Sequence, residues 1–298
     1  MMSSDDLTQI DTPYGVFWTR NHDFVNQQLR EYGGHQRSEI GVVKSLLGKG
    51  GTVIDVGAHI GTFSIPLAQH VGVSGHVYSF EPTAESHQIL SMNIESNGLS
   101  DCVEPVNALV SDQATDYRSQ YQDDHTSAAF YLPVGDEEEA SAAEAEGLAC
   151  ITLDHWAVYE ADLDRLDVIK VDTEGMELRV LRSASSLIEK FKPAIMVEIS
   201  VDHLARAGDT VEEVDRFLRD FGYHLFRNLG SRHSPNEDFR LARIWSAQQV
   251  IGFFDLIAVH PESEYYPAKA LSPIRNFAGW MLKVSSQLPV RVKRKLIG

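Results

Sequence analysis

Apolar, β-branched runs alternate along the chain with segments in which apolar residues recur at helical spacing. The runs that predict strands cover residues 52–56, 76–80, 103–106, 167–171, 194–199 and 250–259. The segments that predict helices cover residues 61–70, 84–97, 176–191 and 211–221. Strands that alternate with helices in this way predict an α/β fold, in which a doubly wound, mostly parallel sheet is covered by helices on both faces.

Three regions do not follow this alternation and suggest how the chain is organised. Residues 1–37 form a lead-in that contains an aromatic patch and ends near a glycine turn. Residues 112–148 hold a predicted hairpin and then an acidic, alanine-rich stretch, which we interpret as a solvated loop. Residues 261–298 form a tail in which apolar residues at helical spacing precede basic ones. The predicted organisation is a lead-in, a main domain at residues 38–260 with an inserted hairpin, and a basic helical tail.

The composition restricts the classes of function. The chain has 298 residues, a hydrophobic fraction of 43% and a formal net charge of −17. Such a negative charge repels phosphate backbones, so nucleic acid is a poor candidate partner. No apolar run is long enough to span a bilayer, and the polar, acidic start does not resemble a secretory signal. With only Cys102 and Cys150, in no metal-binding spacing, we expect reduced thiols in a cytoplasmic enzyme.

A glycine loop follows the first predicted strand. The segment from Gly57 to Gly61 has the spacing G-x-x-x-G, with His59 at its centre and Asp55 two residues before it. Dinucleotide enzymes use G-x-G-x-x-G, in which a middle glycine makes room for a pyrophosphate. Here that glycine is missing, and the carboxylate of Asp55 suits a ligand with an ammonium and a sulfonium group. The spacing therefore favours S-adenosylmethionine over NAD as the cofactor.

The second predicted strand ends in an acidic residue. Glu81 lies 20 residues past Gly61 and follows the run 76–80 directly. A carboxylate at this position can accept hydrogen bonds from the two hydroxyls of a ribose. The alternative is a solvated glutamate that caps the helix beginning near Thr83. Together with the glycine loop, we favour the ribose role.

Four motifs in this order and spacing resemble a known family. They are V-I-D-V-G-A-H-I-G, S-F-E-P, V-I-K-V-D-T-E-G-M-E and P-A-I-M-V-E-I, and they lie within residues 39–226. Together they closely resemble the FkbM family of methyltransferases. The resemblance implies a Rossmann-like class I methyltransferase fold, with a seven-stranded sheet whose last strand is antiparallel. It also implies S-adenosylmethionine as cofactor and O-methylation of hydroxyls, often on sugars or natural products.

The resemblance also assigns residues to the cofactor. It places the glycine loop around the methionine part, Asn107 near the adenine, and Asp172 at the end of the fourth strand, facing the methyl group. His59 stands where the family usually has an asparagine, and both side chains can form hydrogen bonds there. The full set of expected cofactor-binding residues is Glu39, Asp55, Gly57, Ala58, His59, Gly61, Glu81, Pro82, Asn107 and Asp172.

Carboxylates recur at the predicted strand ends, where ligands bind in an open parallel sheet. Like charges repel, so such a group of acids fits a site that holds a cation. A base that removes the hydroxyl proton would assist the transfer, and our first candidate is Asp172, followed by Glu174, Glu198 and His35. The alternative for Asp172 is a cap of the helix that follows it. Asp172, Glu174 and Glu198 could also converge on a divalent metal, but nothing in their spacing demands one, and we predict none.

The leading hypothesis is an O-methyltransferase that acts on a small molecule or glycan. One alternative is an NAD-dependent oxidoreductase on the same class of fold, against which the missing glycine counts. Another is a non-catalytic methyltransferase-like module that binds a partner or a membrane. For the latter, the apolar and basic residues of the tail could make a weak contact with an anionic membrane surface, although we favour a terminal helix docked on the domain.

Overall fold

The computed structural model describes residues 6–112, 117–121, 129–133, 149–247, 253–268 and 270. The acidic stretch at residues 136–147 and the helical part of the predicted tail lie outside the described residues.

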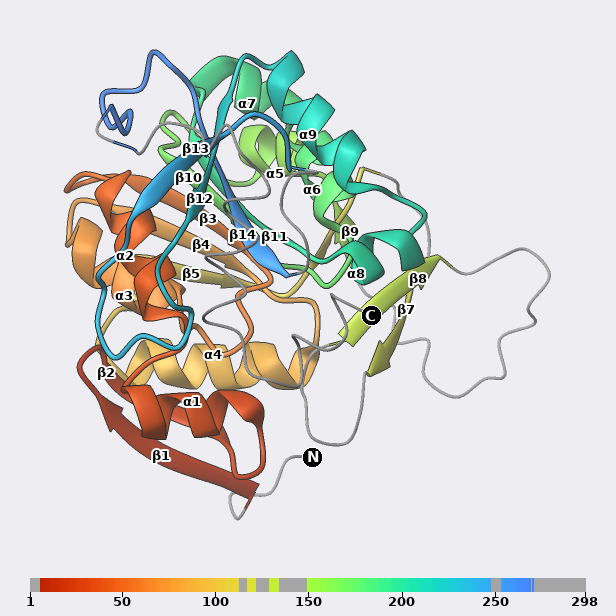
Figure 1. Ribbon diagram of the computed structural model, residues 1–298. Coiled ribbons are helices and arrows are strands. Elements are labelled where there is room, and N and C mark those ends of the chain that lie inside the picture. Colours follow the sequence, from red (N-terminus) through yellow and green to blue (C-terminus); the bar gives the residue numbers. More distant parts are fainter. Residues whose placement is uncertain are drawn as a thin grey trace, which may run out of the picture.

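A single eight-stranded sheet forms the centre of the molecule (Figure 1). Its strand order is β13-β12-β14-β11-β10-β3-β4-β5. Neighbours from β11 to β5 are parallel, whereas β14 runs antiparallel to both β11 and β12. The strands are β3 (Thr52–Val56), β4 (His76–Phe80), β5 (Val103–Val106), β10 (Val168–Val171), β11 (Ala194–Ile199), β12 (His224–Asn228), β13 (Leu241–Ile244) and β14 (Phe254–Val259).

This order confirms the predicted mostly parallel sheet with an antiparallel last strand. The expected number of strands was seven, and the structure has eight because β13 pairs antiparallel with β12 and extends the sheet at that edge. The connection from β12 to β13 is residues 229–240, which we call the β12–β13 loop.

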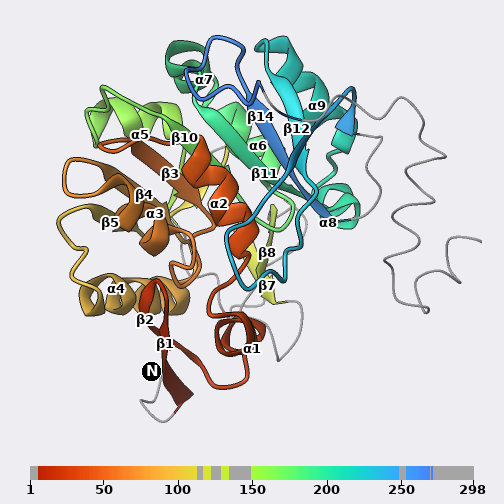
Figure 2. The same ribbon diagram turned by 60° about the vertical axis from the view of Figure 1, so that its left-hand side comes forward.

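Helices cover both faces of the sheet (Figure 2). One apolar core contains residues of α5, α6, α7 and α9, and the other contains residues of α1, α2, α3 and α4. Consecutive residues of one strand divide between the cores, since Val53 belongs to one and Ile54 to the other. The helices are α1 (Phe24–Tyr32), α2 (Arg37–Ser45), α3 (Ser64–Val71), α4 (Ala84–Ser96), α5 (Leu153–Tyr159), α6 (Glu177–Ser183), α7 (Ser185–Phe191), α8 (Val201–Arg206) and α9 (Val211–Asp220).

One predicted helix is in fact two. The segment 176–191 divides at Ala184, whose φ of −111° and ψ of 16° are not helical. Ala184 is fully buried, and the change of direction lets Leu181 and Ile188 contribute to the same core. The apolar spacing alone does not show such a break, because it continues on both sides.

The lead-in packs on the sheet domain. Strands β1 (Leu7–Thr12) and β2 (Gly15–Arg20) form an antiparallel hairpin that lies against α4. Two asparagines of α4 bind the backbone of β2. Asn97 accepts a hydrogen bond from the N–H of Val16 and donates one to its carbonyl, and Asn93 does the same for Trp18. The free backbone edge of β2 is thereby satisfied by side chains.

The inserted hairpin predicted within residues 112–148 is confirmed. It consists of β7 (Tyr117–Tyr121) and β8 (Ala129–Pro133), which pair antiparallel. On either side of it in sequence, β6 (Leu109–Val110) and β9 (Cys150–Ile151) form a short parallel pair. The insertion therefore leaves the domain and returns to it at adjacent points.

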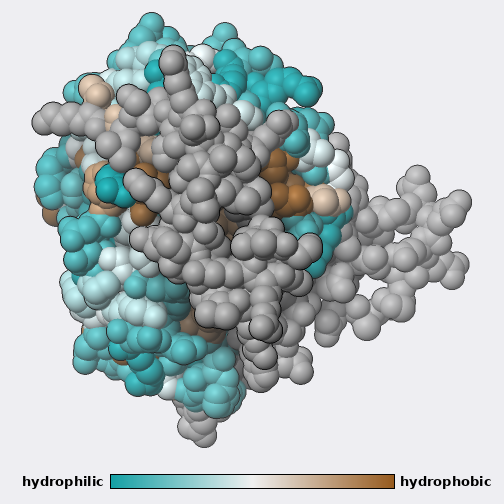
Figure 3. All heavy atoms as spheres, in the orientation of Figure 1, coloured by the Kyte–Doolittle hydropathy of each residue, from teal (hydrophilic) through white to brown (hydrophobic). Residues whose placement is uncertain are grey.

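On the face shown in Figure 3, the described surface is mostly hydrophilic, with small hydrophobic areas. The large apolar side chains that are half exposed include Phe24 and Phe253. Within the described part of the chain, no helix is both long and apolar enough to cross a membrane.

Candidate active site

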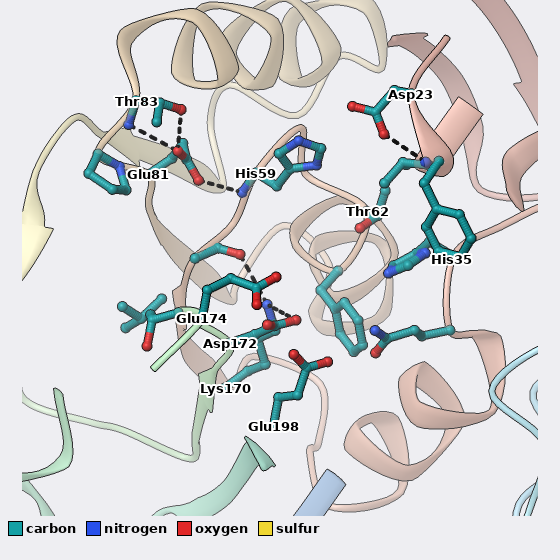
Figure 4. Close-up of a pocket in the computed structure, with 18 of the residues that line it drawn as sticks. Asp23, His35, His59, Thr62, Glu81, Thr83, Lys170, Asp172, Glu174 and Glu198 are labelled. Atoms are coloured by element: carbon teal, nitrogen blue, oxygen red, sulfur yellow. Dashed lines mark hydrogen bonds and ion pairs between the residues drawn. The ribbon is translucent and has the colours of Figure 1, made fainter. Parts of the chain in front are cut away.

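A pocket of about 420 Å³ opens at the carboxyl ends of β3, β4, β10 and β11 (Figure 4). Eight of the residues expected in the site line it, namely His35, Gly57, His59, Glu81, Pro82, Asp172, Glu174 and Glu198. Five others do not line it, namely Glu39, Asp55, Ala58, Gly61 and Asn107. Of these, Gly61 has a φ of 90° and closes the glycine loop by a hydrogen bond from its N–H to the carbonyl of Ala58 at 2.8 Å.

The glycine loop turns sharply against the end of β10. Gly57 has a φ of 78°, and a Cβ at this position would lie 1.8 Å from the carbonyl oxygen of Asp172. Only glycine fits both the backbone conformation and this close approach. The N–H groups of Gly57 and Ala58 both donate to the carbonyl of Phe80 at 3.0 Å, which fixes the loop to the end of β4.

Glu81 is held in one orientation at the edge of the pocket. Its Oε2 accepts a hydrogen bond from the N–H of His59 at 2.9 Å, and its Oε1 accepts from the N–H and the hydroxyl of Thr83 at 3.0 and 2.6 Å. Asn107 lies behind it and donates to the carbonyls of Glu81 and Pro82. Glu81 thus contacts the residue that precedes α4 and also presents a fixed carboxylate to the pocket.

A buried lysine, which the sequence analysis did not identify, connects the strand ends. The Nζ of Lys170 lies 3.2 Å from Oδ1 of Asp55, 3.7 Å from Oδ2 of Asp172 and 3.1 Å from the carbonyl of Gly57. Burial opposes its charge, but the two carboxylates raise the pKa of Lys170 above its ordinary value. Asp55 is fully buried and also accepts a hydrogen bond from Ser64, so its charge faces Lys170 rather than the pocket.

Asp172 and Glu198 share a hydrogen bond between their side chains. Burial disfavours the Asp172 carboxylate, but the Lys170 ammonium and this hydrogen bond hold the pKa of Asp172 below its ordinary value. Burial and the neighbouring Asp172 carboxylate raise the pKa of Glu198 well above its ordinary value. A hydrogen bond between two carboxyl groups needs one proton, and these opposite shifts favour Glu198 over Asp172 as the group that carries it. Helix α6 begins after Met176, its N-cap, so Asp172 does not cap it.

Arg232, from the β12–β13 loop, binds the same acidic group from the other side. Its Nη2 lies 2.5 Å from Oε1 of Glu198, and its Nε lies 3.3 Å from Oδ2 of Asp255. Its guanidinium also stacks over the ring of Phe253, 4.4 Å from the centroid. Arg232 therefore joins β11, β14 and the loop at the wall of the pocket.

Glu174 is the third member of the acidic group, which consists of Asp172, Glu174 and Glu198. It has a left-handed backbone, with a φ of 56°, and its Oε2 lies 2.7 Å from Nδ1 of His203. This contact raises the pKa of His203 above its ordinary value. Asp172, Glu174 and Glu198 each offer a carboxylate oxygen within 4.8 Å of the others, a spacing that could hold a metal ion. Each of the three already has a basic partner, in Lys170, His203 or Arg232.

The turn that carries these acids is held by Glu177, which the sequence analysis also did not identify. Its Oε1 accepts hydrogen bonds from the N–H groups of Thr173 and Gly175, at 3.1 and 3.0 Å. Glu177 is buried, and burial raises its pKa to about 7. Glu177 therefore positions the segment from Asp172 to Glu174 without lining the pocket.

His35 and Glu39 come from the region around α2. His35 lines the pocket, and burial together with Arg232 lowers its pKa to about 3, so its imidazole is neutral. Glu39 is buried and accepts hydrogen bonds from Ser38 at 2.7 Å and Asn228 at 3.3 Å. The structure thus brings His35 to the acidic group and gives Glu39 a supporting position.

Of the site residues that were not predicted, Lys170 has a signal in the sequence and Arg232 has none. Lys170 is a charged residue within an otherwise apolar strand, and that contrast could have identified it as a buried partner of strand-end acids. Arg232 lies in a polar loop and has no such contrast with its neighbours.

Comparison with family models assigns the chain to a family. The family described as "Methyltransferase FkbM domain" matches residues 55–225, more than half of the chain. No curated protein matches the sequence.

Several solved structures are similar to this chain at low identity. Methyltransferase FkbM from Methylobacillus flagellatus KT is 16% identical, with 72% of this chain and 47% of that chain covered and a TM-score of 0.42. A SAM dependent methyltransferase from Aquifex aeolicus is 14% identical, with 78% and 92% covered and a TM-score of 0.41. TYW2 from M. jannaschii, in complex with AdoMet, is 14% identical, with 87% and 86% covered and a TM-score of 0.41.

Similarities this low carry no argument about the reaction or the substrate. The family match stands apart from them, because it spans the glycine loop, Glu81, and the strand ends that carry Asp172 and Glu198. The chain therefore belongs to the FkbM family of S-adenosylmethionine-dependent methyltransferases, as its four motifs predicted.

Proposed function

We propose that the protein transfers the methyl group of S-adenosylmethionine to a hydroxyl of a sugar, glycan or natural-product-type small molecule. The observation that carries the proposal is one pocket in which a fixed carboxylate, Glu81, and a carboxyl with a lowered pKa, Asp172, lie at the carboxyl ends of β4 and β10, on either side of β3. The family match supports methyl transfer, and the acids support a cationic cofactor.

The residues of the pocket fit the parts of this cofactor. Glu81 offers carboxylate oxygens to the ribose hydroxyls, and the buried side chains of Leu109, Val110 and Tyr131 offer an apolar surface to the adenine. The glycine loop allows a close approach of the backbone, since a side chain at Gly57 would collide with Asp172. When bound, the cofactor supplies a methyl group on a positively charged sulfur.

Asp172 is the residue best placed to receive the proton of the acceptor hydroxyl. Lys170 favours its ionised form, and the hydrogen bond to Glu198 beside it fixes its orientation. A carboxylate with a low pKa is a weak base, so the larger contribution of the site is to orient the hydroxyl. Orientation can supply roughly 7–11 kcal/mol, against a factor of about 10²–10⁴ from a base.

Binding of S-adenosylhomocysteine, measured by isothermal titration calorimetry, tests the cofactor part of the proposal. We expect the protein to bind this product and Glu81→Gln to bind it about 10- to 100-fold more weakly, because hydrogen bonds to a charged group contribute about 1.5–3 kcal/mol. Glu85→Gln is the matched control, since Glu85 lies on α4 and pairs with Arg20. A wild-type protein that gives no heat of binding would overturn the proposal.

The acceptor part is tested separately, by methyl transfer from radiolabelled S-adenosylmethionine to a panel of methyl glycosides and small polyhydroxylated lactones. We expect labelled product with the label on oxygen. Label on nitrogen or carbon, or in no product, would reject O-methylation of this class of acceptor.

A further inference from the structure

The pocket has two walls of different origin. One wall is formed by the glycine loop and by Glu81, all within residues 55–225, the segment matched by the family. The opposite wall comes from residues before and after that segment, namely Phe24, Gln28, His35, Arg232, His233 and Phe253. We call it the outer wall. Figure 4 shows His35 and Glu81 on opposite sides of the pocket, with Asp172 nearer its middle.

The outer wall is held together by contacts between the lead-in and the β12–β13 loop. Nε2 of Gln28 lies 3.0 Å from Nδ1 of His233, and the hydroxyl oxygen of Ser38, directly after the lead-in, lies 3.0 Å from the carbonyl oxygen of Ser231. Further along the loop, Glu237 accepts a hydrogen bond from Tyr14 at 2.8 Å. The wall is therefore formed before any ligand binds, although its two halves are about 200 residues apart in sequence.

His35 presents an unused hydrogen-bonding atom in this wall. Its Nδ1 is buried and has no hydrogen-bond partner among the described residues. A buried polar atom without a partner costs about 1–3 kcal/mol, so native structures usually supply one. Because the imidazole is neutral, Nδ1 can accept or donate a hydrogen bond according to its tautomer. A ligand hydroxyl in the pocket would satisfy it in either case.

The geometry of methyl transfer indicates which ligand would place a hydroxyl at Nδ1 of His35. The attacking oxygen must approach the methyl carbon from the side opposite the sulfur, at about 3–3.5 Å. With the ribose at Glu81 and the reacting atoms near Asp172, the acceptor has to lie on the far side of Asp172. That side is the outer wall. At its rim, the rings of Phe24 and Phe253 are about half exposed, at 51% and 49%, and offer apolar faces to an incoming ring.

We infer that the outer wall is the acceptor subsite, and that Nδ1 of His35 binds the hydroxyl that becomes methylated. This inference rests on the proposed function. His35 and Asp172 then hold the same hydroxyl, with Asp172 receiving its proton and His35 fixing the direction of its oxygen.

Carbethoxylation by diethyl pyrocarbonate, read by peptide mass spectrometry, tests the placement of His35 without a known acceptor. We expect saturating S-adenosylhomocysteine to reduce modification of His59, on the cofactor side, at least 10-fold and that of His35 less than about 3-fold. Equal protection of both histidines would show that His35 serves the cofactor and would overturn the inference. A His35 that reacts in neither state would overturn it too. If S-adenosylhomocysteine protects neither histidine, the proposed function fails instead, since the cofactor does not occupy the pocket.

Two substitutions then test the role of Nδ1. His35→Leu removes the nitrogen, and we expect it to keep the affinity for S-adenosylhomocysteine within about 3-fold of wild type. With the methyl glycoside that wild type converts best, we expect its KM for the glycoside to rise at least 10-fold. His35→Asn places an amide nitrogen near the position of Nδ1 and should restore most of that loss. An affinity for S-adenosylhomocysteine lowered more than 10-fold in His35→Leu, or an unchanged KM for the glycoside, would contradict the inference.

Discussion

Charged side chains at the strand ends are paired within the protein before a ligand arrives. Lys170 neutralises Asp55, and Arg232 binds both Glu198 and Asp255. A buried charge without a partner costs several kcal/mol, so each pair also constrains the backbone on which its members lie. The site can therefore concentrate carboxylates near the reacting atoms while the fold remains stable. Asp172, which Lys170 also contacts, lines the pocket together with Glu198.

Glu177 makes the stability of the protein depend on pH. Burial raises its pKa to about 7 in the folded state, above its ordinary value of 4.5. A carboxyl with a raised pKa stabilises the fold fully below about pH 4.5 and loses that contribution as the pH rises through about 7. We expect Glu177→Gln to remove this dependence. Relative to wild type, the variant should gain up to about 3 kcal/mol in its free energy of unfolding between about pH 5 and pH 8.

Urea denaturation of both proteins at the two pH values measures this difference. Glu189→Gln, on the exposed side of α7, serves as the control and should follow wild type at both pH values. If the difference in the free energy of unfolding between Glu177→Gln and wild type were the same at pH 5 and pH 8, the carboxyl of Glu177 would not have the raised pKa stated here.

Part of the site could be predicted from the sequence because its residues follow apolar runs. Glu81 and Asp172 come directly after β4 and β10, and the carboxyl ends of parallel strands meet at one edge of a sheet. Asp55 was expected around the cofactor, but it points to Lys170, a partner 115 residues away. Arg232 likewise joins the site through folding alone, so no local pattern could predict its contact with Glu198.

At the scale of elements, buried parallel strands were the easiest to predict. Strands β3, β4, β5 and β11 have the bounds expected from their apolar runs. In the central strands β3 and β11 nearly every position is buried, because both faces are covered, and such positions favour apolar residues. The hairpin of β12 and β13 was missed. β13 is the edge strand and β12 lies next to it, and polar residues such as Arg227 and Arg243 interrupt the apolar pattern of both.

Helix α2 depends on a glycine for its contact with the β12–β13 loop. Gly41 is buried, and a Cβ there would lie 2.1 Å from the carbonyl oxygen of Glu237. In a helix interior, Gly→Ala ordinarily stabilises by about 0.5–1 kcal/mol. Here the added methyl group meets backbone, so the helix or the loop must move, and we expect Gly41→Ala to destabilise the protein by about 1–3 kcal/mol.

Thermal and urea unfolding of Gly41→Ala would measure this loss. Ser45→Ala, at the exposed end of the same helix, is the control and should change the free energy of unfolding by about 0.5 kcal/mol or less. A stabilised Gly41→Ala would mean that the loop does not pack on α2 in solution, and the preformed outer wall would lose its basis.

At the scale of the whole molecule, the lead-in shares a core with the sheet domain. Ile10, Phe17 and Leu29 belong to the same apolar cluster as Val53 and other residues of the central sheet. The division between a lead-in and a main domain, drawn from the sequence, therefore describes a change of pattern along the chain. It does not mark a gap in the packing, because the outer wall of the pocket also depends on the lead-in.

Substitution of Phe17 tests whether the molecule unfolds as one unit. Phe17 is 1% exposed, and truncation of a buried phenylalanine to alanine costs about 3–5 kcal/mol. Because its core is continuous with that of the sheet, we expect Phe17→Ala to shift the whole unfolding transition. The transition followed by far-ultraviolet circular dichroism should coincide with that followed by tryptophan fluorescence, in a protein that keeps Trp18 in the lead-in and Trp156 in the other core and has Trp245 and Trp280 replaced by phenylalanine. Phe24→Ala, which removes a half-exposed ring from the same lead-in, should cost about 1 kcal/mol or less.

A fluorescence change that precedes the loss of helix signal would show the lead-in detaching by itself, and the acceptor subsite would then be a part of the fold that opens independently.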